Sequence, residues 1–139
     1  MRVLNLLLLG GVVAAAPVAA SAWQHEIIRG LDFYQVRGGG MAVQLVCDPR
    51  SVYGGTTETA LLLNIAGNVD ATAPVTFRFP DGTVVQAALE HGRYGKAEAE
   101  AGAWEALLGG FRSQGSVTVE VSDQTREIDL GEPAAFTCI

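Results

Sequence analysis

Few side chains in this sequence could act as a nucleophile, a base or a metal ligand: there are two cysteines, Cys47 and Cys138, and two histidines, His25 and His91. A redox-active cysteine pair usually has the spacing C-x-x-C, and a cysteine nucleophile needs a free thiol beside a histidine. The two cysteines lie far apart, and neither is adjacent to a histidine in the sequence. We therefore expect Cys47 and Cys138 to form a structural disulfide.

The histidines do not have the spacing of a metal site. A zinc site needs cysteine or histidine ligands at short, defined intervals. His91 lies in an expected loop with no cysteine or second histidine nearby, and His25 is expected in a mobile segment at the start of the folded domain. The sequence therefore predicts neither a bound metal nor another cofactor.

Hydrolytic chemistry would need an activated serine or a pair of carboxylates. The nucleophile motif G-x-S-x-G is absent. Folding could bring Glu98 and Glu100, or Glu127 and Asp129, beside another acid, as glycoside hydrolysis requires. The aromatic residues that would line a sugar cleft are used by the core pattern, so we expect these acids on solvated faces. We predict that the protein is not an enzyme.

The loop from Asp48 to Gly55 carries the best candidates for binding a partner. Arg50 and Tyr53 stand there among glycines, directly after Cys47. Loops held on a rigid scaffold often carry function, and arginine and tyrosine are enriched in protein interfaces. A plain loop with an Asp-Pro-Arg turn is the alternative interpretation.

The charge balance argues against one class of partner. The chain carries 9 Lys and Arg against 15 Asp and Glu, a net charge of −6. Binding to a phosphate backbone needs clustered cations, whereas the arginines here are scattered and Lys96 is the one lysine. We predict no nucleic-acid partner. An even acidic surface or attraction to a basic partner would both fit the composition.

The first 22 residues have the pattern of a signal peptide. Arg2 precedes an apolar stretch, and the small residues Ala20 to Ala22 form an A-x-A cleavage site before Trp23. A transmembrane anchor is the alternative, but the apolar stretch is shorter than the roughly 18 residues that a membrane span needs. We predict a signal peptide over 1–22, a single domain over 23–139, a periplasmic or secreted location, and no stable membrane anchor after cleavage.

Alternation of apolar and polar residues indicates a domain made mainly of strands. The clearest signal is a hairpin in which Val75, Phe77 and Phe79 share one face and Asp81-Gly82 forms the turn. The predicted strands cover 31–36, 41–47, 59–65, 75–79, 83–89, 117–121 and 126–130.

One helix is predicted from Ala97 onward. Trp104, Leu107, Leu108 and Phe111 have the spacing of one helical face, and Gly109-Gly110 is expected to end the helix early. Hairpins joined by short turns favour an antiparallel β-sandwich or a half-open barrel of about seven strands, with the helix covering the sheet.

These features together resemble small β-sandwich proteins of the bacterial envelope. The resemblance rests on a strand that ends in Cys47-Asp48, a helix with the pattern Trp-x-x-Leu-Leu, and a final strand with Leu130-Gly131 before a closing cysteine. The chain is similar to the invasion-associated locus B family and to the accessory proteins of type VI secretion called TagO or VasI. This resemblance implies a role in the envelope or in secretion, without catalytic residues.

We therefore expect an exported cell-envelope protein that works by binding another envelope or secreted protein. The alternative is an inhibitor of an exported enzyme, such as a lysozyme or a protease, in which the anchored loop enters the target's cleft. Lysozyme is a cationic enzyme, which suits an acidic inhibitor.

Overall fold

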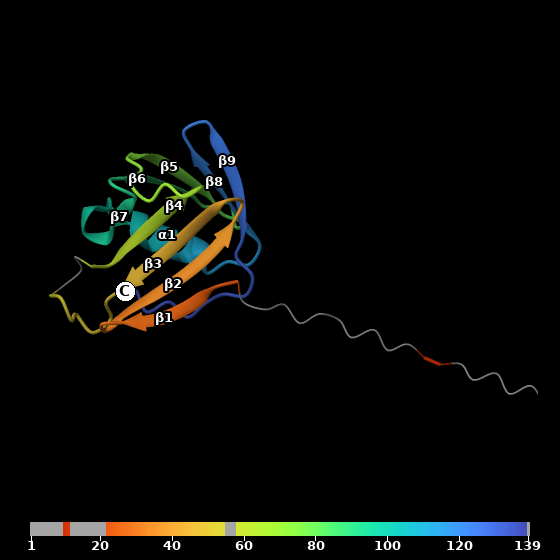
Figure 1. The fold of residues 1–139 in the computed structure, drawn as a ribbon, viewed down its shortest axis with the longest axis horizontal. Helices are drawn as coiled ribbons and strands as arrows, with labels where there is room; N and C mark the ends of the chain where they lie inside the picture. The colour runs from red at the N-terminus through yellow and green to blue at the C-terminus, as the bar shows by residue number, and fades with distance from the viewer. Residues whose placement is uncertain (1–9, 12–21, 55–57, 139) are drawn as a thin grey trace, which may run out of the picture.

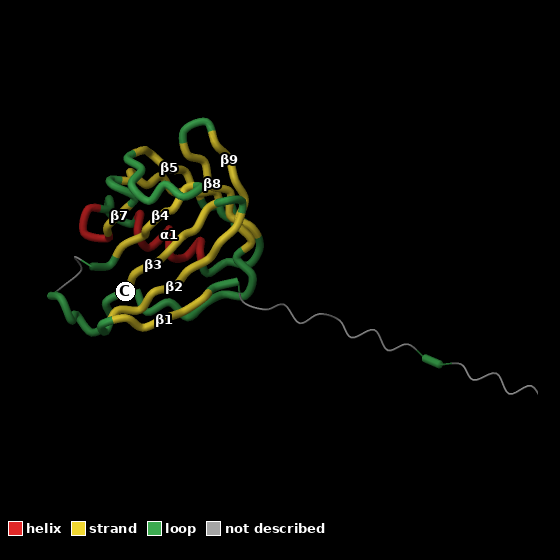
Figure 2. The backbone as a smooth tube through the Cα atoms, viewed as in Figure 1, coloured by secondary structure: helices red, strands yellow, loops and turns green. Residues whose placement is uncertain are grey.

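The computed structural model describes residues 10–11, 22–54 and 58–138. Within this part the chain forms two antiparallel sheets and one α-helix, as Figures 1 and 2 show. The predicted signal peptide lies outside the described residues except for Gly10, Gly11 and Ala22. Among the described residues, no helix combines the length and the hydropathy needed to cross a bilayer.

The larger sheet has five strands in the order β1-β2-β3-β4-β7. Its strands are β1 (Gln24–Ile28), β2 (Leu31–Gly38), β3 (Met41–Cys47), β4 (Ala60–Ile65) and β7 (Arg93–Gly95). The alternation in β3 buries Val43, Leu45 and Cys47 completely, because successive side chains of a strand point to opposite faces. The opposite face carries Gln35 of β2 and Gln44 of β3, which alternate with buried residues.

The smaller sheet has four strands in the order β6-β5-β8-β9. They are β5 (Ala73–Arg78), β6 (Val84–Leu89), β8 (Ser116–Val121) and β9 (Gln124–Asp129). The predicted hairpin is confirmed. Phe79 N–H donates to the Thr83 carbonyl at 2.9 Å, and the Asp81 carboxylate accepts from Thr83 N–H at 2.9 Å.

The two sheets approach each other closely where β2 ends. Gly38 of β2 lies so near β9 that a β-carbon added to it would be 3.1 Å from the Cα of Ile128. Val75, Phe77, Val119 and Ile128 of the smaller sheet are fully buried. The predicted β-sandwich is thus confirmed, and the half-open barrel is not observed, because β1 to β4 and β7 form one sheet and the remaining strands form a second.

The helix α1 (Ala103–Phe111) follows a 3-10 turn, η1 (Lys96–Glu98). Figure 1 shows α1 behind the five-stranded sheet. Trp104, Leu107, Leu108 and Phe111 are buried, as their spacing predicted. The ring of Phe111 lies in the core, 5.7 Å from Trp23 and 5.6 Å from Phe77 between ring centroids.

Three details of the prediction were wrong. The helix begins at Ala103 rather than near Ala97, and it continues through Gly109 and Gly110 instead of ending there. Because Gly110 has no β-carbon, the Phe79 ring can pack directly against this last turn of the helix. The sheets also contain nine strands in the described residues, where seven were expected, since β1 and β7 carried no clear alternation.

Candidate functional site

The predicted disulfide is present. Cys47, the last residue of β3, is bonded to Cys138 in the C-terminal tail, with their Cα atoms 4.6 Å apart across a sequence separation of 91. Both cysteines are buried in the core. The bond therefore fastens the tail to the middle of the five-stranded sheet, and neither sulfur is a free nucleophile.

A polar network lies next to this disulfide. Asp32 is the partner of Cys47 in the register of β2 with β3. Its buried carboxylate is 2.8 Å from Nε2 of His25 and accepts a hydrogen bond from the Thr137 hydroxyl at 2.7 Å. Burial by itself would raise the pKa of Asp32, but the bonds from Thr137 and His25, with the charges of His25 and Arg50, outweigh burial and lower this pKa below its usual value.

His25 is therefore held in place, contrary to the expectation of a mobile segment. It belongs to β1, pairs with Tyr34 in the register, and stacks on the Tyr34 ring with centroids 4.4 Å apart. Tyr34 in turn donates to the Ala135 carbonyl at 3.1 Å. Because these partners come from the two ends of the domain, the sequence held no local signal for this network.

The order of groups in this network is not that of a hydrolase. In a catalytic triad the histidine stands between the nucleophile and the acid. Here the Asp32 carboxylate stands between His25 and Thr137, so the imidazole does not take the threonine proton. The network instead clamps β1 and the tail onto β2.

The loop that follows Cys47 is organised by Asp48. The Asp48 carboxylate accepts from the backbone N–H of Val52 at 2.9 Å and of Tyr53 at 3.3 Å, and the Asp48 carbonyl accepts from Ser51 N–H at 3.3 Å. Asparagine and aspartate commonly fix turns by such bonds to nearby backbone N–H groups. The described part of the loop, up to Gly54, therefore has a defined shape.

Both residues that the sequence singled out reach the turn between β1 and β2. Arg50 donates to the Gly30 carbonyl at 3.2 Å, and the Tyr53 hydroxyl donates to the Arg29 carbonyl at 3.4 Å. A side-chain carbon of Val52 would meet a β-carbon on Gly30 at 3.0 Å. The structure thus brings Arg50 and Tyr53 together on one surface, next to a turn that sequence reasoning had not linked to them.

We call this surface, formed by Ile28, Arg29, Arg50, Val52 and Tyr53, the loop–turn surface. Its three apolar or aromatic side chains are 45 to 50% exposed, a large fraction for residues of this type. A hollow of about 480 Å³ opens beside it, lined in part by Ile28, Arg29 and Tyr53. Exposed apolar side chains that gather between arginines are characteristic of protein-binding surfaces.

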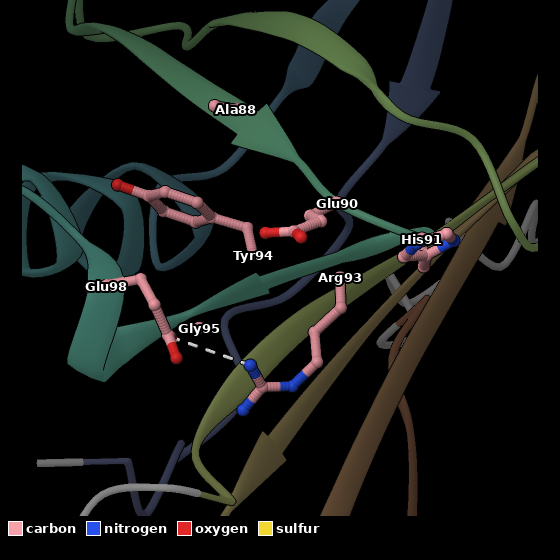
Figure 3. A pocket seen from close by; sticks show the side chains of 7 residues that line it. All are labelled: Ala88, Glu90, His91, Arg93, Tyr94, Gly95 and Glu98. Carbon is pink, nitrogen blue, oxygen red and sulfur yellow. Dashed lines mark ion pairs between the residues drawn. The ribbon is translucent and has the colours of Figure 1, made fainter.

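A second hollow, of about 400 Å³, lies beside β7 and is shown in Figure 3. Arg93 and Glu98 form an ion pair there with a nitrogen–oxygen distance of 3.5 Å, and Gly95 leaves room for it. Burial, and then the charge of Glu100, raise the pKa of Tyr94. His91 lies at the far end of the hollow from Tyr94 and is 3.0 Å from Asp70, so these groups do not converge on one point.

The other predicted acids do not gather either. Among the described residues, no group of three or more histidine, cysteine, aspartate or glutamate side chains is placed to hold a metal ion. Glu127 and Asp129 are exposed on β9, and Glu100 is exposed before α1. The loop–turn surface is therefore the candidate site.

Comparison of the chain with protein-family models, curated proteins and solved structures gives no match. What the fold defines is the class of the protein: the described residues form an antiparallel β-sandwich with one α-helix and one disulfide.

Proposed function

We propose that this protein is an exported component of the bacterial cell envelope that acts by binding another envelope or secreted protein, without catalysis of its own. The observation that carries the proposal is the loop–turn surface, on which an ordered loop presents Arg50, Val52 and Tyr53. Preorganisation of this kind lowers the entropy lost on binding.

Two further points support export and an envelope role. A buried disulfide persists in oxidising compartments such as the periplasm, and is rare in the bacterial cytosol. The resemblance to envelope β-sandwiches of the invasion-associated locus B and TagO or VasI type agrees with the same location. We therefore place the mature protein in the periplasm or outside the cell.

The test is capture of a partner from envelope extract. We expect Arg50→Ala combined with Tyr53→Ala to abolish capture and to lower the melting temperature by no more than a few degrees, since the bonds of both side chains are exposed. The matched control is Val84→Ala with Arg126→Ala, which truncates two exposed side chains of the smaller sheet. Equal capture by both double variants would reject the loop–turn surface as the binding site.

Inhibition of an exported enzyme is the second candidate function. The observation in its favour is that the loop starts at a disulfide and is braced by Asp48, so it could enter a cleft without losing its shape. Hydrolysis of bacterial cell walls by lysozyme, and of casein by an exported protease, would be measured with increasing amounts of the protein. A concentration-dependent decrease that the Arg50/Tyr53 double variant lacks supports inhibition, whereas unchanged rates exclude it for that enzyme.

A further inference from the structure

We infer that the outer face of the five-stranded sheet binds an uncharged polysaccharide along a row of glutamine side chains. This site contains none of the five residues of the loop–turn surface, although Phe33 lines both this site and the hollow beside that surface, and it adds a ligand to the proposed protein partner. The inference rests on the register of the sheet, on the hydrogen bonding of the glutamines and on the hollows around them.

The register aligns three glutamines across three neighbouring strands. Gln24 of β1 is paired with Gln35 of β2, and Gln35 is paired with Gln44 of β3. The row continues to Leu62 of β4. Neighbouring strands lie about 4.8 Å apart, so the row from Gln24 to Leu62 spans roughly 14 Å.

These side chains point away from the core. Gln35 stands between the buried residues Tyr34 and Val36, and Gln44 stands between the buried residues Val43 and Leu45. Because side chains alternate along a strand, both glutamines lie on the opposite face. Figure 1 shows this face turned toward the viewer, with α1 behind the sheet.

Several amide donors and acceptors of the row are not used in hydrogen bonds within the protein. Within the described ranges, the amides of Gln24 and Gln44 have no hydrogen-bond partner in the protein, although Gln44 is half-buried. When the Gln35 amide is oriented so that its oxygen faces donors, this oxygen accepts from the Arg37 guanidinium at 3.2 and 3.3 Å. The Gln35 nitrogen then remains available as a donor. Each free amide offers both donors and an acceptor.

Two hollows that share Gln35 and Gln44 adjoin the row, and we call the row together with these hollows the groove. One, of about 440 Å³, is lined by the three glutamines and by His25, Glu26 and Phe33. The other, of about 210 Å³, shares Gln35 and Gln44 with it and extends to Leu62. Half-buried Phe33, two positions along β2 from Gln35, and half-buried Leu62, the register partner of Gln44, provide apolar surface beside the amides, which suits the C–H faces of sugar rings.

The chemistry of the groove favours a sugar chain over a peptide. The unpaired backbone groups of this sheet lie at its edges, on β1 and β7, and point along the plane of the sheet, so a ligand that lies on the face of β2 and β3 cannot join the sheet as a further strand. Recognition must therefore come from side chains, and amides that donate and accept at once match hydroxyl groups that do the same. The three glutamines carry no charge, and the charged groups beside them, Glu26 at one hollow and Arg37 on Gln35, have opposite signs, which fits a neutral chain.

The first test needs no substitution. Purified ¹⁵N-labelled protein would be titrated with three neutral oligosaccharides, cellohexaose, maltohexaose and chitohexaose, and the side-chain amide resonances followed by NMR. We expect saturable shifts of Gln24, Gln35 and Gln44 with at least one of the three sugars, while Gln86, exposed on β6 of the other sheet, does not shift.

Substitutions then measure how much a single glutamine of the row contributes to sugar binding. We expect Gln44→Ala to weaken binding of that oligosaccharide about tenfold, through loss of a hydrogen bond in a partly enclosed groove, and Gln86→Ala to leave it unchanged. The Arg50/Tyr53 double variant should bind the sugar normally, which separates this inference from the proposed function.

Three results would overturn the inference. The glutamine resonances could stay unmoved by all three sugars at millimolar concentration, or the shifts could map to another face. Alternatively, a mixture of random decapeptides could move the three glutamine resonances at lower concentration than any of the sugars, which would make the groove a peptide site.

Discussion

The charge of Asp32 contributes to the stability of the fold. Its buried carboxylate interacts with both His25 and Thr137. Because its pKa is lowered on folding, the wild-type protein gains stability that is fully present above the unfolded-state pKa of about 3.9 and is lost as the pH falls through the lower folded-state pKa.

Asp32→Asn should therefore destabilise the protein in a pH-dependent way. At pH 7 we expect it to lower the free energy of unfolding by about 1 to 3 kcal/mol, the usual cost of disturbing a buried hydrogen-bonded charge. The difference should shrink below about pH 4, since the wild-type carboxyl is then losing its charge as well. Urea unfolding of both proteins between pH 7 and pH 2 measures this, and a difference that stays constant with pH would contradict the assigned role of the charge.

At the scale of single residues, the sequence predicts features that follow from the number and spacing of one residue type. It does not predict contacts between residues that are far apart in the chain. Two cysteines without a redox motif were enough to predict the bond of Cys47 to Cys138. Nothing local joins Asp32 to Thr137, which are 105 positions apart. Arg50 and Tyr53 were selected by type and loop position, but their bonds to the turn before β2 became visible only in the fold.

At the scale of elements, the last turn of α1 depends on one of two adjacent glycines. A β-carbon on Gly110 would overlap the ring of Phe79, which is itself buried, whereas a β-carbon on Gly109 would meet nothing within 4 Å. The Phe79 ring cannot easily move away from such a β-carbon, because it packs against Phe111 at a centroid distance of 5.0 Å.

Alanine at these two positions should change stability in opposite directions. We expect Gly110→Ala to lower the free energy of unfolding by about 1 to 3 kcal/mol through overpacking. Gly109→Ala should raise it by about 0.5 to 1 kcal/mol, because alanine is the better helix former at an exposed position. Thermal and urea unfolding of both variants test the pair. If the two substitutions changed the free energy of unfolding equally, their effect would come from the end of the helix rather than from the contact with Phe79.

The elements that the sequence predicted correctly are those with one buried face. The alternation of Val75, Phe77 and Phe79 and the Asp81-Gly82 turn defined their hairpin because core and turn requirements agree there. β1 is exposed at all five residues and has no such alternation, so it could not be recognised. β7 has three residues, too few for a periodic pattern.

At the scale of the whole molecule, the disulfide holds the C-terminal tail against the larger sheet. The chain-entropy model gives about 4 to 5 kcal/mol for a closed loop of this length, a large share of the stability of a small domain. We expect Cys47→Ala with Cys138→Ala to lower the free energy of unfolding by roughly that amount, measured by urea unfolding. An effect below about 1 kcal/mol would show that noncovalent contacts alone hold the tail.

The disulfide and the Asp32 network hold the same tail, so their contributions should depend on each other. Thr137 precedes Cys138 in the sequence, and Asp32 is the register partner of Cys47. With the disulfide intact, Thr137→Val should cost about 1 kcal/mol through loss of the hydroxyl bond. Without the disulfide the tail is freer to leave the sheet, and the same substitution should cost clearly less.

A double-mutant cycle measures this coupling. The four proteins are the wild type, Thr137→Val, the cysteine-free variant and their combination, unfolded with urea in buffer containing sulfate, which strengthens apolar burial and keeps the weakest of them folded. Thr118→Val, on a half-buried strand position of the smaller sheet remote from the tail, is the matched control and should cost the same with or without the disulfide. Strict additivity for Thr137 would mean that the tail stays in place without its covalent bond, and the clamp formed by His25, Asp32 and Thr137 would then be sufficient by itself.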